Sequence, residues 1–290
     1  MKSKIIILTP VYNDWKNLKK LLVKINKIFE KKIKKNFDLI IVNDCSNDLY
    51  DLKRYKLKMI KKIYLINLKK NVGSQRAIAI GIKYIDSIYK KKFRTIIIDS
   101  DGQDNPQIIQ KMLSISKTRP ESSIAVNRGQ RKEELWFRVF YELYCFTIKI
   151  FYFRKIRFGN FSLINSNHLK IISRQKELWS AFPPTLSKSV SNLIHITANR
   201  ERRYSGDSKM NFFGLIRHAL RVFSVLKNKV IFSSTIYLIL SFLIIYKHSE
   251  FYFFIIFSLL VFFNLIIFIF SMGNKKNLSK NLSKAKIKSF

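Results

Sequence analysis

Four short apolar runs, each followed by polar turn residues, constrain much of the chain to a layered α/β fold. The runs lie at residues 4–8, 39–42, 63–66 and 96–98. Segments with apolar residues at helical spacing follow the first, third and fourth runs, at residues 18–29, 74–89 and after residue 106. Strands that alternate with helices at this interval predict a mostly parallel sheet with helices on both faces.

An acidic cluster follows the fourth run, in the sequence Asp-Ser-Asp-Gly-Gln-Asp at residues 99–104. Asp99 and Asp101 lie two residues apart at a predicted strand end, so both carboxylates can reach one cation. Mg²⁺ and Mn²⁺ prefer such oxygen ligands and share them with substrate phosphates. The chain has no glycine-rich or Walker-type phosphate loop, so the cluster predicts a site for a metal-bound diphosphate. The alternative for an isolated Asp-x-Asp is a solvated acidic turn.

Polar residues at the other strand ends are expected in the same crevice, because ligands of open α/β folds bind at the carboxyl edge of the sheet. Tyr12 can stack on a base or ribose, and Asp44 can accept hydrogen bonds from a base edge. Together with the acidic cluster, these residues predict a pocket for a nucleotide diphosphate.

The chain is strongly basic, with 55 Lys and Arg against 18 Asp and Glu and a formal charge of +37 over 290 residues. This excess favours polyanionic partners such as nucleic acid, anionic lipid surfaces or phosphorylated substrates. The lysines are scattered through the whole chain, so charge alone is a weak basis for a nucleic-acid binder, and we expect no such partner. Cys45 and Cys145 lie far apart and form neither a metal-ligand pair nor a disulfide framework.

Two apolar runs, at residues 230–246 and 251–272, are each long enough to span a bilayer as a helix. The short connection between them requires an antiparallel hairpin. Lysines flank the pair on both sides, at positions 227, 229, 275, 276 and 280, which predicts that both flanks and both chain ends are cytoplasmic. The alternative is an interfacial or core helix pair. No cleavable signal peptide is expected at the start of the chain.

The sequence therefore predicts four parts. They are an α/β domain at residues 1–210, a juxtamembrane amphipathic helix at 211–229, a transmembrane hairpin at 230–272 and a basic cytoplasmic tail at 273–290. A further aromatic stripe at helical spacing, between residues 132 and 154, predicts either a core helix or a membrane-surface helix.

Six motifs occur in a fixed order, at residues 9–14, 42–48, 71–81, 99–104, 159–161 and 203–209. They resemble the motifs of family 2 glycosyltransferases with the Rossmann-like GT-A fold, especially the membrane-attached polyprenyl-phosphate sugar transferases akin to dolichol-phosphate mannose synthase. The resemblance covers residues 5 to about 220. It implies an inverting enzyme that moves a sugar from a nucleotide-diphosphate donor to a polyprenyl-linked acceptor at the cytoplasmic membrane face, for a cell-envelope polysaccharide. UDP or GDP is expected in preference to CDP.

The resemblance also implies a role for each matching residue. The nucleotide pocket would comprise Pro10, Tyr12, Asp14, Val42, Asp44 and Ser100. The ligands of Mg²⁺ or Mn²⁺ would be Asp99, Asp101 and Gln103. Arg203 and Lys209 would close over the diphosphate and stabilise the negative charge of the leaving group. Arg128 and Arg131 would suit an acceptor phosphate, the alternative being solvated surface arginines.

The sequence departs from the family pattern at Asn160, where polyprenyl-phosphate transferases usually have an aspartate in Gly-Asp-Phe. An amide cannot accept a proton as a general base. A lipid phosphate is already ionised and needs no strong base, so Asn160 would then only orient it. A sugar hydroxyl would require another base, with Asp104 or Glu177 as candidates. Met210 replaces a usual tyrosine, a smaller departure.

One other interpretation of the function stays open at this point. The change at Asn160 also suits a catalytically silent membrane protein that kept the fold and binds partners, although the intact acidic and basic motifs argue against it. Membrane lipids are expected partners of the hairpin. The oligomeric state is left open, a homo-oligomer included.

Overall fold

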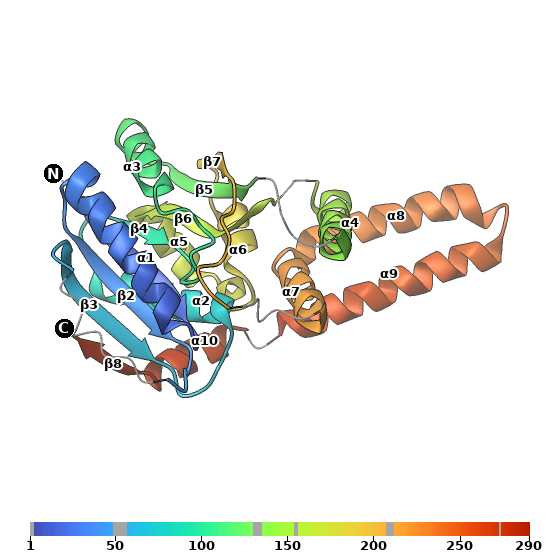
Figure 1. The fold of residues 1–290 in the computed structure, drawn as a ribbon. Coiled ribbons are helices and arrows are strands. Elements are labelled where there is room, and N and C mark those ends of the chain that lie inside the picture. Colours follow the sequence, from blue (N-terminus) through green and yellow to red (C-terminus); the bar gives the residue numbers. More distant parts are fainter. Residues whose placement is uncertain (1–2, 49–56, 130–134, 154–155, 207–211, 273) are drawn as a thin grey trace.

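One mixed sheet organises the α/β part of the computed structural model, which describes residues 3–48, 57–129, 135–153, 156–206, 212–272 and 274–290. Within these residues the sheet has eight strands in the order β7-β5-β6-β4-β1-β2-β3-β8 (Figure 1). The strands are β1 (Lys4–Val11), β2 (Phe37–Asn43), β3 (Ile60–Asn67), β4 (Phe93–Ile97), β5 (Ser123–Arg128), β6 (Phe158–Asn165), β7 (Leu193–Ala198) and β8 (Lys286–Ser289).

Helices of three kinds connect the strands and form the C-terminal region. The α-helices are α1 (Trp15–Ile28), α2 (Ser74–Ile88), α3 (Ile108–Thr118), α4 (Leu135–Tyr152), α5 (Ser166–Arg174), α6 (Phe182–Ser189), α7 (Phe212–Val225), α8 (Lys227–Ser241), α9 (Glu250–Ser271) and α10 (Asn274–Ser283). Short π-helical or 3₁₀ segments are η1 (Phe29–Ile33), η3 (Lys176–Trp179) and η4 (Phe242–Tyr246).

The sheet is parallel around β1, as the sequence predicts. β1 pairs in parallel with β2 and β4, and β2 pairs in parallel with β3. β5 and β7 form a further parallel pair, whereas β6 runs antiparallel between β4 and β5. The mostly parallel sheet is confirmed, and the four predicted strands are β1 to β4, with bounds that differ by a few residues.

Alternate side chains of β1 pack on opposite faces of the sheet, because successive strand residues point in opposite directions. Ile6 and Leu8 belong to the core that includes α2, α5 and α6, and Ile5 and Ile7 belong to the core that includes α1 and α3. A Cβ atom at Gly81 of α2 would lie 2.3 Å from Leu8 Cδ1. The absence of a side chain at Gly81 therefore allows this helix to approach the sheet closely.

The two apolar runs form a helical hairpin that projects away from the sheet (Figure 1). Its helices extend over Lys227–Tyr246 and Glu250–Ser271, with mean hydropathies of 1.9 and 3.0, and both are long and apolar enough to cross a membrane. Asn264 Nδ2 of α9 donates to Ser234 Oγ of α8 at 2.9 Å. Of the most apolar stretch of α9, 6% is buried, so this helix lacks the burial of a core helix.

Two further helices lie at the base of the hairpin and expose apolar side chains (Figure 1). α4 packs against α8, where Tyr237 Oη donates to the carbonyl of Ile150 at 2.7 Å. Leu143 and Phe146 of α4 are 58% and 60% exposed, and Phe213 of α7 is 72% exposed. The aromatic stripe predicted between residues 132 and 154 thus includes a helix with an exposed apolar surface beside the hairpin.

The C-terminal segment, expected as a basic tail, packs on the α/β domain instead. β8 pairs antiparallel with β3, with Tyr64 opposite Ser289, and Leu278 of α10 is 4% exposed in the hydrophobic core. Without β8, β3 would be an edge strand with unpaired backbone groups, and lysine-rich β8 supplies the charged edge that discourages further pairing. Both ends of the hairpin consequently join elements of the same domain.

The docking of α10 makes a prediction about stability. Leu278→Ala should lower the free energy of unfolding by about 2–3 kcal/mol, because it leaves a cavity between α10 and the domain. Ile287→Ala on β8, where the side chain is 41% exposed, is the matched control and should cost less than about 1 kcal/mol. Thermal unfolding of the purified full chain in detergent measures both. Equal shifts would contradict the docking.

Candidate active site

The acidic cluster forms a tight turn directly after β4, at the edge of the sheet where β1 and β2 also end. Asp101 Oδ1 accepts a hydrogen bond from the backbone N–H of Gln103 at 3.0 Å. Gly102 has φ +80°, and a Cβ there would lie 2.2 Å from the ring of Tyr204. The turn therefore requires glycine for two reasons, its backbone conformation and the ring that covers it.

The carboxylates of this turn carry unfavourable negative charge. Burial and the neighbouring Asp101 raise the pKa of Asp99. Burial and then Asp99 raise the pKa of Asp104 to about 7. Arg200 and Arg128 act on both groups in the opposite direction. A cation bound by these carboxylates would relieve their repulsion.

The donor set of the turn fits a hard divalent cation that shares its coordination with a substrate. Asp99, Asp101 and the amide of Gln103 present oxygen atoms, which Mg²⁺ and Mn²⁺ prefer. Within the part of the chain that the structure describes, no group of three or more His, Cys, Asp or Glu side chains forms a metal cage. One or two carboxylates suffice when phosphates and water supply the other ligands.

Asn160, at the start of β6, points its amide at the acidic turn. Its Nδ2 lies 2.9 Å and 3.1 Å from the two carboxylate oxygens of Asp99. Its Oδ1 accepts from Gln75 Nε2 at 2.7 Å. The residue that replaces the usual aspartate is thus a donor to Asp99. Of the two base candidates, Asp104 lies in the acidic turn, whereas Glu177 forms an ion pair with Lys188 at 3.1 Å.

A segment before α7 lies over the acidic turn and is anchored to α1. Arg203 forms an ion pair with Asp14 through Nη2, and its Nη1 lies 3.7 Å from Asp101 Oδ2. The backbone N–H of Tyr204 donates to the carbonyl of Asp101 at 3.2 Å. Asn17 Nδ2 donates to the carbonyl of Ser205 at 2.9 Å. The structure thus brings Arg203, Asp14 and Asp101 together.

The other residues expected in the nucleotide pocket differ in their exposure to solvent. Tyr12 directly follows β1 at the carboxyl edge of the sheet and is 37% exposed. Asp44 is 2% exposed, and its two oxygens accept from the backbone N–H groups of Val72 and Gly73 at 2.7 Å and 2.8 Å. Asp44 therefore holds the loop before α2 in place, whatever else it contacts.

Three more of these residues are buried. Pro10 lies in the buried stretch of β1, and Ser100 is 7% exposed. The side chain of Val42 is fully buried in the hydrophobic core, because the alternation of β2 directs it inward. Val42 can thus meet a ligand only through its backbone. Arg131 and Lys209 lie outside the described residues.

A group of basic side chains lies near the site. Arg128 was expected there from the sequence, whereas Arg76, Arg217 and Arg221 were not. Burial and then Arg217 lower the pKa of Arg76. Burial, Arg76 and Arg217 lower the pKa of Arg221 to about 10. Burial, Arg128 and Arg221 lower the pKa of His218 to about 4. Arg217 contributes to both arginine shifts. The arginines of this group, from α2, β5 and α7, form an anion-attracting region, whereas His218 is neutral at pH 7.

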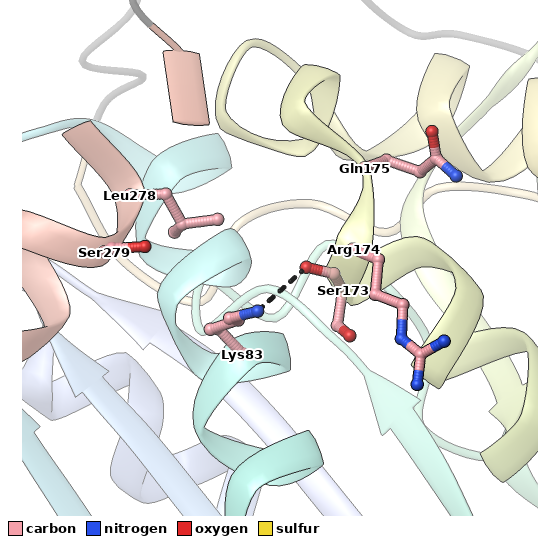
Figure 2. Close-up of a pocket in the computed structure, with 6 residues that line it drawn as sticks. All are labelled: Lys83, Ser173, Arg174, Gln175, Leu278 and Ser279. Carbon is pink, nitrogen blue, oxygen red and sulfur yellow. Dashed lines mark hydrogen bonds between the residues drawn. The ribbon is translucent and has the colours of Figure 1, made fainter. Parts of the chain in front are cut away.

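A small cavity lies elsewhere, where α10 meets α2 and α5 (Figure 2). Its lining residues are Lys83, Ser173, Arg174, Gln175, Leu278 and Ser279, and Lys83 Nζ donates to the carbonyl of Ser173 at 3.5 Å. Its volume of about 140 Å³ is below the range of nucleotide-sized pockets. It includes none of the predicted site residues.

The raised pKa of Asp44, about 6, predicts how stability depends on pH. Burial is its main cause and outweighs the hydrogen bonds from Val72 and Gly73 and the charge of Arg76. The stabilising contribution of Asp44 is full below about pH 4 and is lost as the pH rises through about 6. An asparagine at position 44 does not titrate. Between pH 5 and 7 the Tm of Asp44→Asn should therefore fall by a few degrees less than the Tm of the parent. Thermal unfolding of the full chain without divalent cations measures this, and identical pH dependence of both proteins would refute it.

Sequence comparison relates this site to known proteins. Residues 6–179 match the model of glycosyl transferase family 2. The uncharacterized glycosyltransferase sll0501 of Synechocystis sp. is 27% identical over 235 residues, which cover 76% of this chain and 68% of that protein. The uncharacterized glycosyltransferase YkcC of Bacillus subtilis is 29% identical over 133 residues, 46% of this chain and 39% of that protein.

Structural comparison agrees at the level of the fold. A crystal structure of glucosyl-3-phosphoglycerate synthase from Mycobacterium tuberculosis, in complex with Mn²⁺, UDP and glucosyl-3-phosphoglycerate, matches with a TM-score of 0.56 and 11% identity. The match covers 79% of this chain and 80% of that one. Since the family model covers more than half of the sequence, including the acidic turn and Asn160, the chain belongs to the family 2 glycosyltransferases and has their GT-A fold.

Proposed function

We propose that this glycosyltransferase moves a sugar from a nucleotide-diphosphate donor to a lipid-linked acceptor at the cytoplasmic face of a membrane, with inversion at the anomeric carbon. The observation that carries the proposal is the acidic turn of Asp99 and Asp101 beneath Arg203, at the edge of the sheet where open α/β folds bind ligands. The arrangement combines carboxylates for a cation with a guanidinium for a phosphate.

The donor would lie on this turn with a divalent cation. Glucosyl-3-phosphoglycerate synthase binds Mn²⁺ and UDP on the same fold, which supports a UDP-sugar and Mn²⁺ or Mg²⁺ here. Asp99, Asp101 and Gln103 would hold the cation, which neutralises the diphosphate as it departs. Tyr12 would stack on the nucleoside. Arg203 would move away from Asp14 and Asp101 and contact the phosphates together with Lys209. A guanidinium aimed at the departing charge stabilises it in the transition state.

The cationic group suits an anionic acceptor. Arg76, Arg217 and Arg221 influence one another's charge, and Arg128 and Arg221 act on His218. α7, which carries Arg217 and Arg221, lies at the base of the hairpin (Figure 1). A polyprenyl phosphate would bring its phosphate there and attack the anomeric carbon directly, because its oxygen is already ionised. A lipid-linked saccharide would instead lose a hydroxyl proton to a base, for which Asp104, with its pKa of about 7, is suited.

The hairpin would place the acceptor. α8 and α9 would span the bilayer, with the exposed apolar side chains of α4 and α7 at its surface. Lysines at both bases of the hairpin favour a cytoplasmic domain. Both hairpin ends join the α/β domain, which is consistent with that orientation (Figure 1).

The proposal is tested by assaying the purified chain in lipid nanodiscs. Radiolabelled UDP-, GDP- and CDP-sugars are each supplied with polyprenyl phosphate or with a polyprenyl-linked saccharide, and label in the organic phase is counted. We expect transfer from one donor, lost on addition of EDTA and restored by Mn²⁺ or Mg²⁺. Transfer to water-soluble acceptors alone would contradict a lipid acceptor, and EDTA-resistant transfer would contradict the cation.

A single substitution tests the acidic turn. Asp101→Asn should lower kcat/KM at least about 100-fold, because an amide removes a charged ligand of the cation and of the diphosphate it carries. Membrane insertion should be unchanged. Glu30→Gln on exposed η1 removes the same charge away from the site and should keep full activity. Activity within about 2-fold of the parent in Asp101→Asn would contradict the assignment.

A further inference from the structure

Three successive hydrogen-bonded contacts link the acidic turn to the start of α6 through side-chain amides. The backbone N–H of Phe182 donates to Gln75 Oε1 at 2.9 Å. Gln75 Nε2 donates to Asn160 Oδ1 at 2.7 Å. Asn160 Nδ2 donates to both carboxylate oxygens of Asp99, at 2.9 Å and 3.1 Å. Gln75 lies in the first turn of α2, so three separate elements and the end of β4 meet in this row.

The direction of the row is fixed at its far end. A backbone N–H can only donate, so Gln75 must present its oxygen to Phe182 and its nitrogen to Asn160. Asn160 must then present its oxygen to Gln75 and its nitrogen to Asp99. The orientation of an amide is set by its partners in this way, and here each step permits one orientation.

The surroundings keep the row in place. Phe182 is fully buried and Asn160 is 5% exposed, so water does not readily replace their partners. Pro183 and Pro184 follow Phe182 in the first turn of α6 and have no N–H of their own. The N–H of Phe182 is therefore a backbone donor of this helix start that needs an acceptor, and Gln75 supplies it.

We propose that Gln75 is a positioning residue that, through Asn160, holds the Asp99 carboxylate in the orientation that binds the divalent cation. The proposal rests on the metal-dependent donor binding proposed above. The Nδ2 donor of Asn160 is shared between both oxygens of Asp99, which orients the carboxylate and leaves each oxygen with a lone pair for a cation. A ligand ordered before binding loses less conformational freedom on binding, and partners of metal ligands commonly change metal affinity 10- to 100-fold.

The same row gives a reason for the amide at position 160. An aspartate there could accept from Gln75 Nε2, but it would have no hydrogen for Asp99. Its carboxylate would face those of Asp99 and Asp101, which already repel each other. With a glutamine at position 75 whose direction is set by Phe182, asparagine satisfies both neighbours.

The test measures Mn²⁺ affinity of the full chain in detergent by electron paramagnetic resonance, with and without UDP. Gln75→Met and Asn160→Leu keep the size of the side chain and break the row of hydrogen bonds at different residues. Each should weaken Mn²⁺ binding about 10-fold. The double variant should bind Mn²⁺ no more weakly than the weaker-binding single variant, because the same row of hydrogen bonds is broken in all three proteins. Gln110→Met, at an exposed position of α3, is the control and should match the parent.

The outcomes separate this proposal from the proposed function. If the parent chain binds no Mn²⁺ either with or without UDP, the metal assignment itself fails. If the parent binds Mn²⁺ and Gln75→Met binds it equally well, or if the two substitutions add fully, the role of Gln75 is refuted. Thermal unfolding in EDTA reports any structural loss separately. Gln75→Asn, which keeps an amide but is too short for both partners, replaces Gln75→Met should that variant not fold, with the same expectation.

Discussion

Repulsion among carboxylates at the end of β4 is the constraint to which the rest of the site responds. Asp99, Asp101 and Asp104 lie in one tight turn, and burial strengthens their mutual repulsion. The surrounding side chains offset it, with Asn160 donating to Asp99 and Arg203 placed beside Asp101. A site that concentrates negative charge in this way is suited to a cation that arrives with its substrate.

The fold explains why these groups meet. β4 is central in the sheet and parallel to β1, so the acidic turn and the Asp14 turn emerge at the same edge. α1 begins at that edge and holds the Arg203 segment through Asp14 and Asn17. Elements more than a hundred residues apart in sequence thus form one surface, with the arginines of α2 and α7 nearby.

Much of this could be predicted from local sequence, because strand ends and acidic turns are local features. The strands β1 to β4, the hairpin and the position of Asp99 and Asp101 all follow from short patterns. Gln75 could not be found in this way, since its partners lie 85 and 107 residues further along the chain. Val42 was expected in the pocket, but strand alternation buries its side chain. The segment containing β8 was expected to be a basic tail, because its partner strand β3 is distant in sequence and local patterns do not show the pairing.

The central claim is that the carboxylates of Asp99 and Asp101 hold the cation that carries the donor diphosphate. Diffraction from crystals of the full chain grown with Mn²⁺ and a UDP-sugar, with anomalous data collected at the manganese edge, tests it most directly. The account predicts one strong anomalous peak within coordination distance of both carboxylates and of the diphosphate, about 2.0–2.4 Å from their oxygens. A bound diphosphate with no such peak, or a peak away from these two residues, would contradict it.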